Sequence, residues 1–149
     1  MQITQRTKIA GLIGHPVAHS LSPALHNHLY DKLGLDMAYA AFDVPPERVA
    51  AAVDGLRALG FIGFNITIPH KTAVIGHLDR LSGDAEEVGA VNTVVNDSGV
   101  LRGHNTDIDG VIGAFEEADC EIEGMTVLIM GSGGGARACA AAMMREGAE

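Results

Sequence analysis

Lys71 is the side chain best placed for acid–base chemistry, because it follows a run in which polar residues end an apolar strand. The run is FNITIPHK (64–71), whose alternation sets Asn65 and Thr67 on one strand face. Ligands bind at the C-terminal ends of strands in open α/β sheets. We predict Lys71 in the first turn of a following helix, where the positive helix end and burial favour loss of its proton. It could then act as general acid or base, and a plain surface lysine is an equally good interpretation.

Asp107 and Asn92 could complete this chemistry. Asp107 lies at a predicted helix start and could pair with Lys71, so that its carboxylate orients the ammonium group. Asn92 offers both a hydrogen-bond donor and an acceptor. Each residue also has a simpler explanation, an N-cap for Asp107 and a hairpin position without ligand for Asn92. Spacing alone favours the simpler explanation for Asn92.

Two serines, Ser20 and Ser22, lie two residues apart before a predicted helix. In an extended backbone their hydroxyls project to the same side and could donate to both oxygens of one carboxylate. Spacing alone favours another interpretation, in which Ser22 is the N-cap before Pro23 and Ser20 is a solvated loop residue. Even then the loop would lie beside a helix N-terminus, which helps to hold an anion.

A glycine-rich loop, GSGGGAR (131–137), fits the G-x-G-x-x-A pattern of dinucleotide-binding proteins. It follows the apolar run MTVLIM (125–130) and precedes a helical pattern, which makes a merely flexible turn the weaker interpretation. Its glycines would let a pyrophosphate approach a helix N-terminus. The residue that reads the ribose lies about 20 positions further on, so the loop itself fits NAD and NADP equally.

The elements that position these residues alternate between strands and helices. Strands are predicted at 8–14, 37–44, 61–68, 90–95, 100–104 and 125–130. Helices are predicted from Ser22 to Gly34, from Pro45 to Gly60 with Val49, Val53, Leu56 and Leu59 on one face, after Pro69, near Ser82, at 107–118 and from the glycine loop to about 146. We expect an α/β fold, with a three-layer αβα substrate-binding domain and a mostly parallel sheet at 1–106. A linker helix and a truncated Rossmann-type βα unit would occupy 107–149.

Composition narrows the range of partners. The net charge of −9, with only ten Lys and Arg residues, argues against nucleic-acid binding. No stretch reaches the apolar length of a membrane span. Cys120 and Cys139, without a CxxC spacing, are typical of a reducing cytoplasm. Seven histidines show no ligand spacing, so we expect no metal site, and His70 remains a minor candidate for proton transfer.

Together the motifs resemble those of the shikimate dehydrogenases. The stretches that carry the resemblance are GHPVAHSLSP (14–23), FNITIPHK (64–71), GAVNTV (89–94), NTDxxG (105–110) and GSGGGAR (131–137). The resemblance implies an enzyme that reduces 3-dehydroshikimate to shikimate with NADPH, on the route to chorismate and the aromatic amino acids. We therefore expect this chain to be an N-terminal fragment of such an enzyme, inactive by itself.

The resemblance also implies a role for each motif residue. Ser20 and Ser22 would bind the substrate carboxylate, and Lys71 would be the catalytic acid or base with Asp107 as its partner. The ring hydroxyls would be bound by Asn65, Thr67, Asn92 and Asp107. The NADP phosphates would be held by Gly131, Ser132, Gly133, Gly134, Gly135, Ala136 and Arg137.

The same residues allow two alternative functions, and one apolar segment predicts self-association. The chain could be a non-catalytic module that binds shikimate or a similar hydroxylated acid, or its enzyme could prefer quinate. The apolar strand 125–130 would lack most of its sheet. We therefore expect the chain to associate through that edge, for example as a homodimer.

Overall fold

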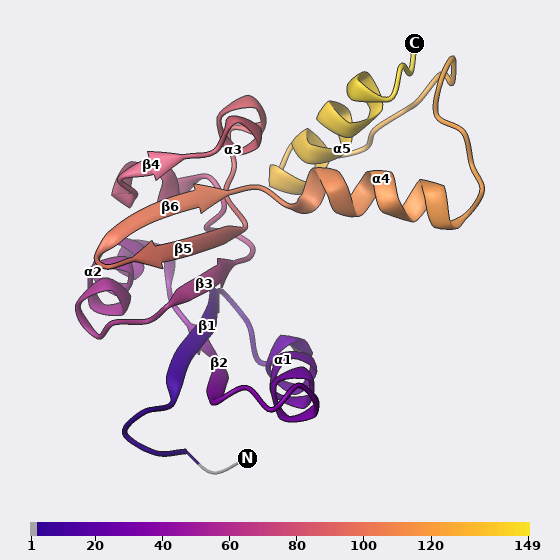
Figure 1. The fold of residues 1–149 in the computed structure, drawn as a ribbon. Coiled ribbons are helices and arrows are strands. Elements are labelled where there is room, and N and C mark those ends of the chain that lie inside the picture. The colour runs from indigo at the N-terminus through magenta and orange to yellow at the C-terminus, as the bar shows by residue number, and fades with distance from the viewer. Residues whose placement is uncertain (1–2) are drawn as a thin grey trace.

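The computed structural model describes residues 3–149 and contains one six-stranded sheet with helices around it and a helical pair at one end (Figure 1). The strands are β1 (Lys8–Gly14), β2 (Met37–Asp43), β3 (Gly63–Ile66), β4 (Arg80–Leu81), β5 (Thr93–Asp97) and β6 (Val100–His104). The α-helices are α1 (Ser22–Lys32), α2 (Val49–Ala58), α3 (Gly83–Val88), α4 (Asp107–Glu117) and α5 (Gly134–Arg145). Two 3₁₀ turns, η1 (Pro46–Arg48) and η2 (Ala73–His77), complete the described elements.

The sheet has the strand order β2-β1-β3-β5-β6-β4 and is mixed. The pairs β1–β2, β1–β3 and β4–β6 are parallel, whereas β3–β5 and β5–β6 are antiparallel. Both antiparallel pairs involve β5, so the other strands all run in one direction and the expectation of a mostly parallel sheet is confirmed. The hairpin β5–β6 turns through Ser98 and Gly99, which both have positive φ, as its Asn-Asp-Ser-Gly sequence predicts.

Helices cover both faces of the sheet, as expected for three layers. On one face α2 packs into the main core through Val49, Val53 and Leu56. Leu59, predicted on the same face, is instead 77% exposed, because α2 ends at Ala58 and the chain turns away through Gly60. On the other face α1 covers β1 and β2 over a smaller core.

A second core joins α4 and α5 beside the sheet (Figure 1). Ile108 of α4 and Ala138 and Ala142 of α5 are fully buried in it. Val88 and Ala90, which precede β5, belong to the same core. This packing fixes the N-terminus of α5 against the edge of the sheet.

The predicted strand at 125–130 does not form. These residues are extended, and their burial alternates, with Val127 half-buried and Leu128 and Met130 exposed, yet no described strand pairs with them. A strand is defined by its ladder, and an apolar run without a neighbouring strand cannot make one. Within residues 3–149 no helix is long and apolar enough to cross a membrane.

Candidate functional site

The edge of the sheet where most strands end gathers the polar residues of the motifs. Ser20 and Ser22 follow β1, Thr67 and Lys71 follow β3, and Asp107 follows β6. Because β1, β3 and β6 run in the same direction, their C-terminal ends lie at one edge. Strand β5 runs the other way, so its start places Asn92 at that edge as well. The topology thus brings together segments that are far apart in sequence.

Lys71 and Asp107 form the ion pair at the centre of this edge. The Lys71 Nζ lies 2.7 Å from Asp107 Oδ2, and their side chains are 19% and 28% exposed. The Lys71 carbonyl accepts from the Val91 N–H at 2.7 Å, which holds the backbone of the lysine against the segment that leads into β5. The pairing predicted for these two residues is present.

Asn92 fixes the carboxylate of that pair. Its Nδ2 donates to Asp107 Oδ1 at 2.7 Å and to Thr106 Oγ1 at 2.9 Å, and its Oδ1 accepts from the Thr106 N–H at 3.0 Å. The buried Asn105 holds the same turn, since its Oδ1 accepts from the Asp107 N–H and its Nδ2 donates to the Ala90 carbonyl. One oxygen of Asp107 therefore faces Asn92 and the other faces Lys71.

The helix end beside Lys71 is not the one that the sequence predicts. Lys71 lies in a turn before η2, which is a short 3₁₀ turn, so the prediction of a first helical turn is wrong. The positive end near Lys71 belongs to α5 instead. A Cβ placed on Gly134, the first residue of α5, would lie 3.2 Å from Lys71 Cδ and 3.2 Å from Ala90 Cβ. Arg145, at the other end of α5, bonds Asp84 at 2.6 Å and Glu87 at 2.5 Å on α3, which holds α5 in place.

The two serines lie at the start of α1 and line one cavity of about 440 Å³ with His15, His19 and Thr67. The Ser22 N–H donates to Ser20 Oγ at 3.3 Å. The prediction that Ser22 is the N-cap is wrong, because Leu21 occupies that position without a side-chain cap and Ser22 is the first helical residue. Among residues 3–149 neither hydroxyl donates to another protein group, so both remain available to a ligand.

Three adjoining cavities join these groups into one site. The serine cavity shares Thr67 and Ile68 with a cavity of about 600 Å³ that the glycine loop lines. That cavity shares Lys71 and Gly135 with a third of about 570 Å³, which Asp107 also lines. Lys71 therefore lies one cavity away from Ser20 and Ser22 rather than beside them. Gly14 lets Thr67 pack closely against the end of β1, since a Cβ there would come within 2.3 Å of Thr67 Cγ2.

Asn65 adjoins the serine cavity but is not among its lining residues. It pairs in register with Leu12, which lines that cavity, and its side chain is bound to Tyr39, Thr93 and Asn92. The sequence interpretation missed Tyr39 and Thr106. Thr106 belongs to the NTDxxG motif and occupies the N-cap position predicted for Asp107, again without a side-chain cap bond. No motif contains Tyr39. Only the alternation of inward and outward side chains along its half-buried strand could have predicted that Tyr39 points inward.

The glycine loop has the features that a pyrophosphate requires. Gly131 has φ +135°, and Gly133 is the N-cap of α5 without any side-chain cap, which leaves the first N–H groups of the helix open to an anion. All the predicted cofactor residues are exposed or half-buried and line the same cavity; they are Gly131, Ser132, Gly133, Gly134, Gly135, Ala136 and Arg137. The loop therefore fits the phosphates of a dinucleotide.

Other reactive side chains lie outside this site. His70 is 1% exposed, and its Nε2 bonds the Val44 carbonyl at 2.6 Å, so it serves the core and not proton transfer. Cys120 and Cys139 are free thiols. Within the described part of the chain no three His, Cys, Asp or Glu side chains group as metal ligands.

Comparison with known proteins agrees with the sequence motifs. The family model described as the shikimate dehydrogenase substrate binding domain matches residues 12–94. A relative from Caldanaerobacter subterraneus, named shikimate dehydrogenase (NADP(+)), is 48% identical over 149 residues, which are 100% of this chain and 53% of the relative. Another of that name from Methanothermobacter thermautotrophicus is 51% identical over 146 residues, 98% of this chain and 51% of the relative. The chain spans about half the length of the curated relatives it matches.

Solved structures agree with the fold. Shikimate dehydrogenase from Aquifex aeolicus superposes with a TM-score of 0.96 at 39% identity, over 99% of this chain and 56% of that one. The enzyme from Thermus thermophilus, solved in complex with NADP(H) and shikimate, gives a TM-score of 0.89 at 41% identity, over 95% of this chain and 54% of that one. Since the family model covers more than half of the 149 residues and the fold agrees, the chain belongs to the shikimate dehydrogenase family and carries its substrate-binding domain.

Proposed function

We propose that the protein to which this chain contributes is an NADP-dependent shikimate dehydrogenase, which interconverts 3-dehydroshikimate and shikimate on the route to chorismate. The observation that carries the proposal is the Lys71–Asp107 pair at 2.7 Å, whose lysine lines the glycine-loop cavity that adjoins the serine cavity. The names of the relatives and the Thermus thermophilus complex with shikimate and NADP(H) support the same substrate and cofactor.

The residues of this chain would divide the work between holding the ring and moving a proton. Ser20 and Ser22 would donate to the two oxygens of the substrate carboxylate, because both hydroxyls are available in one cavity. Thr67, at the junction of the cavities, would bind a ring hydroxyl. Lys71 would hold the proton that the ring oxygen gains or loses. Asp107 orients the ammonium group, and Asn92 orients Asp107 and would lie near the ring hydroxyls.

NADP(H), when bound, supplies the hydride that the reaction exchanges with the ring carbon. The chain's own contribution to holding it is the loop 131–137 and the uncapped N-terminus of α5, against which phosphate oxygens would accept hydrogen bonds. Because Gly134 lies against Lys71, this cofactor position borders the proton-transfer pair directly.

The test is turnover by the full protein that the gene encodes, followed as NADP⁺-dependent oxidation of shikimate. We expect turnover with shikimate, and a stable protein that binds NADP⁺ but never oxidises shikimate would contradict the proposal. Calorimetry on the 149-residue chain is a second measurement. We expect it to bind shikimate without turnover, since it supplies only one loop and one helix to NADP(H).

Two alternatives give different results in the same experiments. A non-catalytic binding module would bind shikimate in the full protein and show no turnover with NADP⁺. A quinate enzyme would prefer quinate to shikimate in a competition assay. The Lys71–Asp107 pair favours the dehydrogenase over the binding module, since a module has no use for a proton donor at this position.

The arrangement of the protein is part of the proposal. We propose a division into a substrate-binding domain at 1–106 and a linker helix with part of a nucleotide-binding domain at 107–149, supported by the end of the sheet at His104. We further propose a cytoplasmic location, supported by the free thiols of Cys120 and Cys139. Small molecules, and not nucleic acids, are the partners that a net charge of −9 favours.

A further inference from the structure

Tyr39 connects the edge strand β2 to a residue of the site across the neighbouring strand. It is 5% exposed, packs with Leu12 and Val17 under α1, and its hydroxyl donates to Asn65 Oδ1 at 2.7 Å. Strand β1 lies between the two, and the small side chain of Ala10, which pairs with Tyr39, leaves room for the ring to reach β3. Among residues 3–149, Tyr39 is the one group that donates to the Asn65 carboxamide oxygen.

The bonds on both sides of Asn65 decide which way its amide faces, since the Asn92 carbonyl can only accept and Tyr39 then donates to the oxygen. The Asn65 Nδ2 donates to Thr93 Oγ1 at 3.1 Å and to the Asn92 carbonyl at 3.4 Å, so both of its protons point toward β5. The Oδ1 is left with one lone pair after it accepts from Tyr39. Held in this orientation, Asn65 offers a ligand an acceptor, and a flipped amide would offer a donor instead.

Tyr39 is itself fixed by α1. The Asn27 side chain bonds both the N–H and the carbonyl of Tyr39, at 2.9 and 2.8 Å, and also the Pro23 carbonyl at 2.7 Å. The His26 ring stacks on the Tyr39 ring, with centroids 4.2 Å apart and planes 10° apart. Burial lowers the pKa of His26, which favours a neutral ring in the stack. Since α1 begins at Ser22, the same contacts relate Asn65 to the serine pair.

Burial also raises the pKa of the Tyr39 hydroxyl, with a smaller contribution from Tyr30. The hydroxyl therefore stays protonated and remains a donor across the pH range in which enzymes work. If Tyr39 served only to fill the core, a phenylalanine ring would do the same work. The hydroxyl and its bond to Asn65 therefore point to a role beyond packing.

We propose that Tyr39 is a positioning residue for the substrate, which acts through Asn65 by holding its carboxamide oxygen toward a ring hydroxyl. This inference rests on the proposed function for the identity of the ligand. Tyr39 would not touch the substrate; it fixes the orientation of Asn65, which would contact the ring while the serines hold the carboxylate.

The test compares Tyr39→Phe with the unchanged full protein in turnover of shikimate with NADP⁺. The variant keeps the ring and its stack on His26 and loses only the donor. We expect KM for shikimate to rise about 3- to 10-fold, the range of one neutral hydrogen bond, with kcat nearly unchanged. Tyr30→Phe, a tyrosine on α1 that also borders His26, is the matched control and should leave KM unchanged.

Two further measurements separate positioning from a merely structural role. In an Asn65→Ala background the Tyr39→Phe change should add no further rise in KM, because its route to the substrate is gone. A variant that lowers the melting temperature at constant KM, or a rise in KM that persists in the Asn65→Ala background, overturns the inference.

A ligand-free measurement keeps the inference separate from the proposed function. Hydrogen exchange of the Asn65 side-chain amide, observed by NMR, should be faster in Tyr39→Phe than in the unchanged protein and unaffected in Tyr30→Phe. Equal exchange in all three refutes the role of Tyr39 whether or not shikimate binds. Failure of the unchanged protein to bind shikimate refutes the proposed function alone.

Discussion

The Lys71–Asp107 pair concentrates the expected chemistry in two half-buried side chains that other residues hold from both sides. Asn92 occupies the Asp107 oxygen that Lys71 leaves free, and the Val91 N–H holds the Lys71 backbone. An ion pair at 2.7 Å fixes the position of the lysine ammonium group. The group can therefore deliver its proton to a ligand oxygen at one defined position. The pair is therefore suited to proton transfer to a ligand that occupies the neighbouring cavity.

Replacement of Lys71 tests this role directly. Lys71→Ala should lower kcat for shikimate oxidation by about 10²- to 10⁴-fold, while the fold is retained because the side chain is partly exposed. Lys32→Ala, on the exposed last turn of α1, is the matched control and should keep full activity. Nearly full turnover by Lys71→Ala would remove the lysine from the mechanism.

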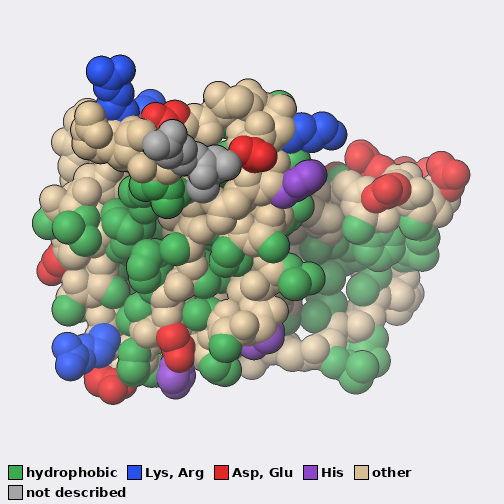
Figure 2. All heavy atoms as spheres, turned by 90° about the horizontal axis from the view of Figure 1, so that it is seen from below, with side chains coloured by type: hydrophobic (Ala, Val, Ile, Leu, Met, Phe, Trp, Pro, Cys, Tyr) green, Lys and Arg blue, Asp and Glu red, His purple; other side chains and the backbone are tan. Residues whose placement is uncertain are grey.

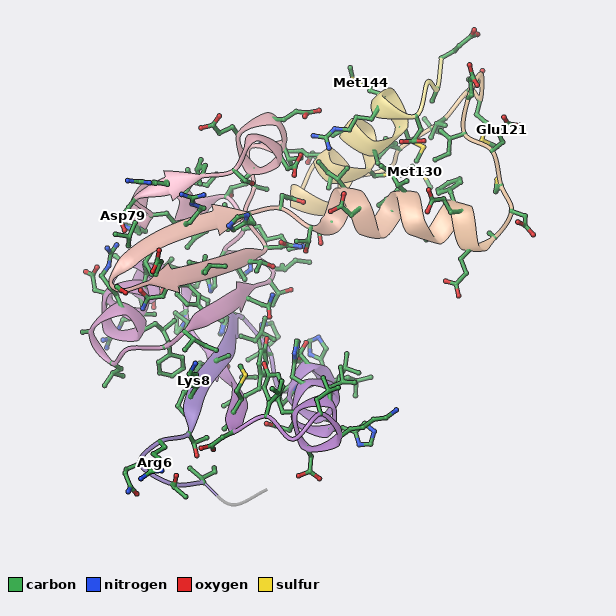
Figure 3. All side chains as sticks on the ribbon, in the orientation of Figure 1. Arg6, Lys8, Asp79, Glu121, Met130 and Met144 are labelled. Carbon is green, nitrogen blue, oxygen red and sulfur yellow. The ribbon has the colours of Figure 1, made fainter. Side chains whose placement is uncertain are left out.

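Asp79 supports a prediction about stability at low pH. It accepts from the Leu101 N–H and from Arg57, each at 2.7 Å, and these two donors, the backbone group first, hold the pKa of Asp79 below its ordinary value of 3.8. A lowered pKa means that the charged form stabilises the fold above the ordinary value, and that this stability is lost as the pH falls through the folded value. Figure 3 labels Asp79 beside β4.

The corresponding variant is Asp79→Asn. At neutral pH its melting temperature should lie below that of the unchanged protein, and the gap should close in acid below pH 3.8. Thermal unfolding followed by circular dichroism at both pH values measures this, with the exposed Asp54→Asn on α2 as control. A gap that stays constant with pH would show that the carboxylate charge plays no part.

At the residue scale, the sequence predicted which motif residues lie together better than it predicted the contacts that hold them. The Lys71–Asp107 pairing and the common position of Ser20 and Ser22 follow from motifs that end strands or start helices. Tyr39 could not be found this way, because its bond to Asn65 crosses β1 and depends on strand order. Likewise the place of His70 in the core depends on the approach of Val44 from another segment.

The helix α5 shows how one element brings two motifs together. Its first residue, Gly134, lies against the aliphatic part of Lys71, and its last turn is tied to α3 by Arg145. The glycine at this position leaves room for the lysine, and in the proposed function it would also leave room for a phosphate.

Gly134→Ala tests whether this close packing matters for activity independently of the stability of the helix. The added Cβ would lie 3.2 to 3.3 Å from Lys71 and Ala90 atoms, closer than ordinary contact, so the lysine or the helix must shift. We expect kcat to fall while the melting temperature changes little, since alanine favours the helix by up to about 1 kcal/mol. Gly113→Ala in α4, where a Cβ would meet nothing within 4 Å, is the control and should raise stability without change in kcat. Unchanged kcat in Gly134→Ala would show that Lys71 tolerates the contact.

The ends of the helices could be predicted from capping and turn residues. The predictions were wrong where contacts between distant segments determine the structure. Gly34 and Gly60 have positive φ just past α1 and α2, as a helix stop requires. The apolar run 125–130 reads as a strand by composition, yet strand formation needs a partner that a local pattern cannot supply. For the same reason the helix end that faces Lys71 could not be assigned from neighbours in sequence.

Exposed apolar surface is a feature of the whole molecule. Figure 2 shows hydrophobic side chains spread over the face seen from below. The exposed leucines of α1 and its flanking loops are Leu21, Leu25, Leu29, Leu33 and Leu35. The extended segment adds Leu128 at 86% and Met130 at 90% exposure, and Figure 3 labels Met130 near α4 and α5. Both lie on one side of an extended backbone without a strand partner among the described residues.

We therefore propose that the 149-residue chain associates through residues 125–130. Light scattering should give a mass above that of the 15.5 kDa monomer, and Leu128→Lys should return it toward the monomer. Leu59→Lys, at a residue 77% exposed elsewhere on the surface, should not. A monodisperse monomer for the unchanged chain would contradict the proposal.

Association of this kind should stop at small assemblies, because both borders of the sheet resist templated growth. At one border Asn27 already occupies the outward N–H and carbonyl of Tyr39, in the middle of β2, so an incoming chain finds these positions filled. At the other border β4 is two residues long and offers little to copy. Copies that meet only outside the sheet can close on each other as pairs, whereas cross-β fibrils would require one of these borders to open first.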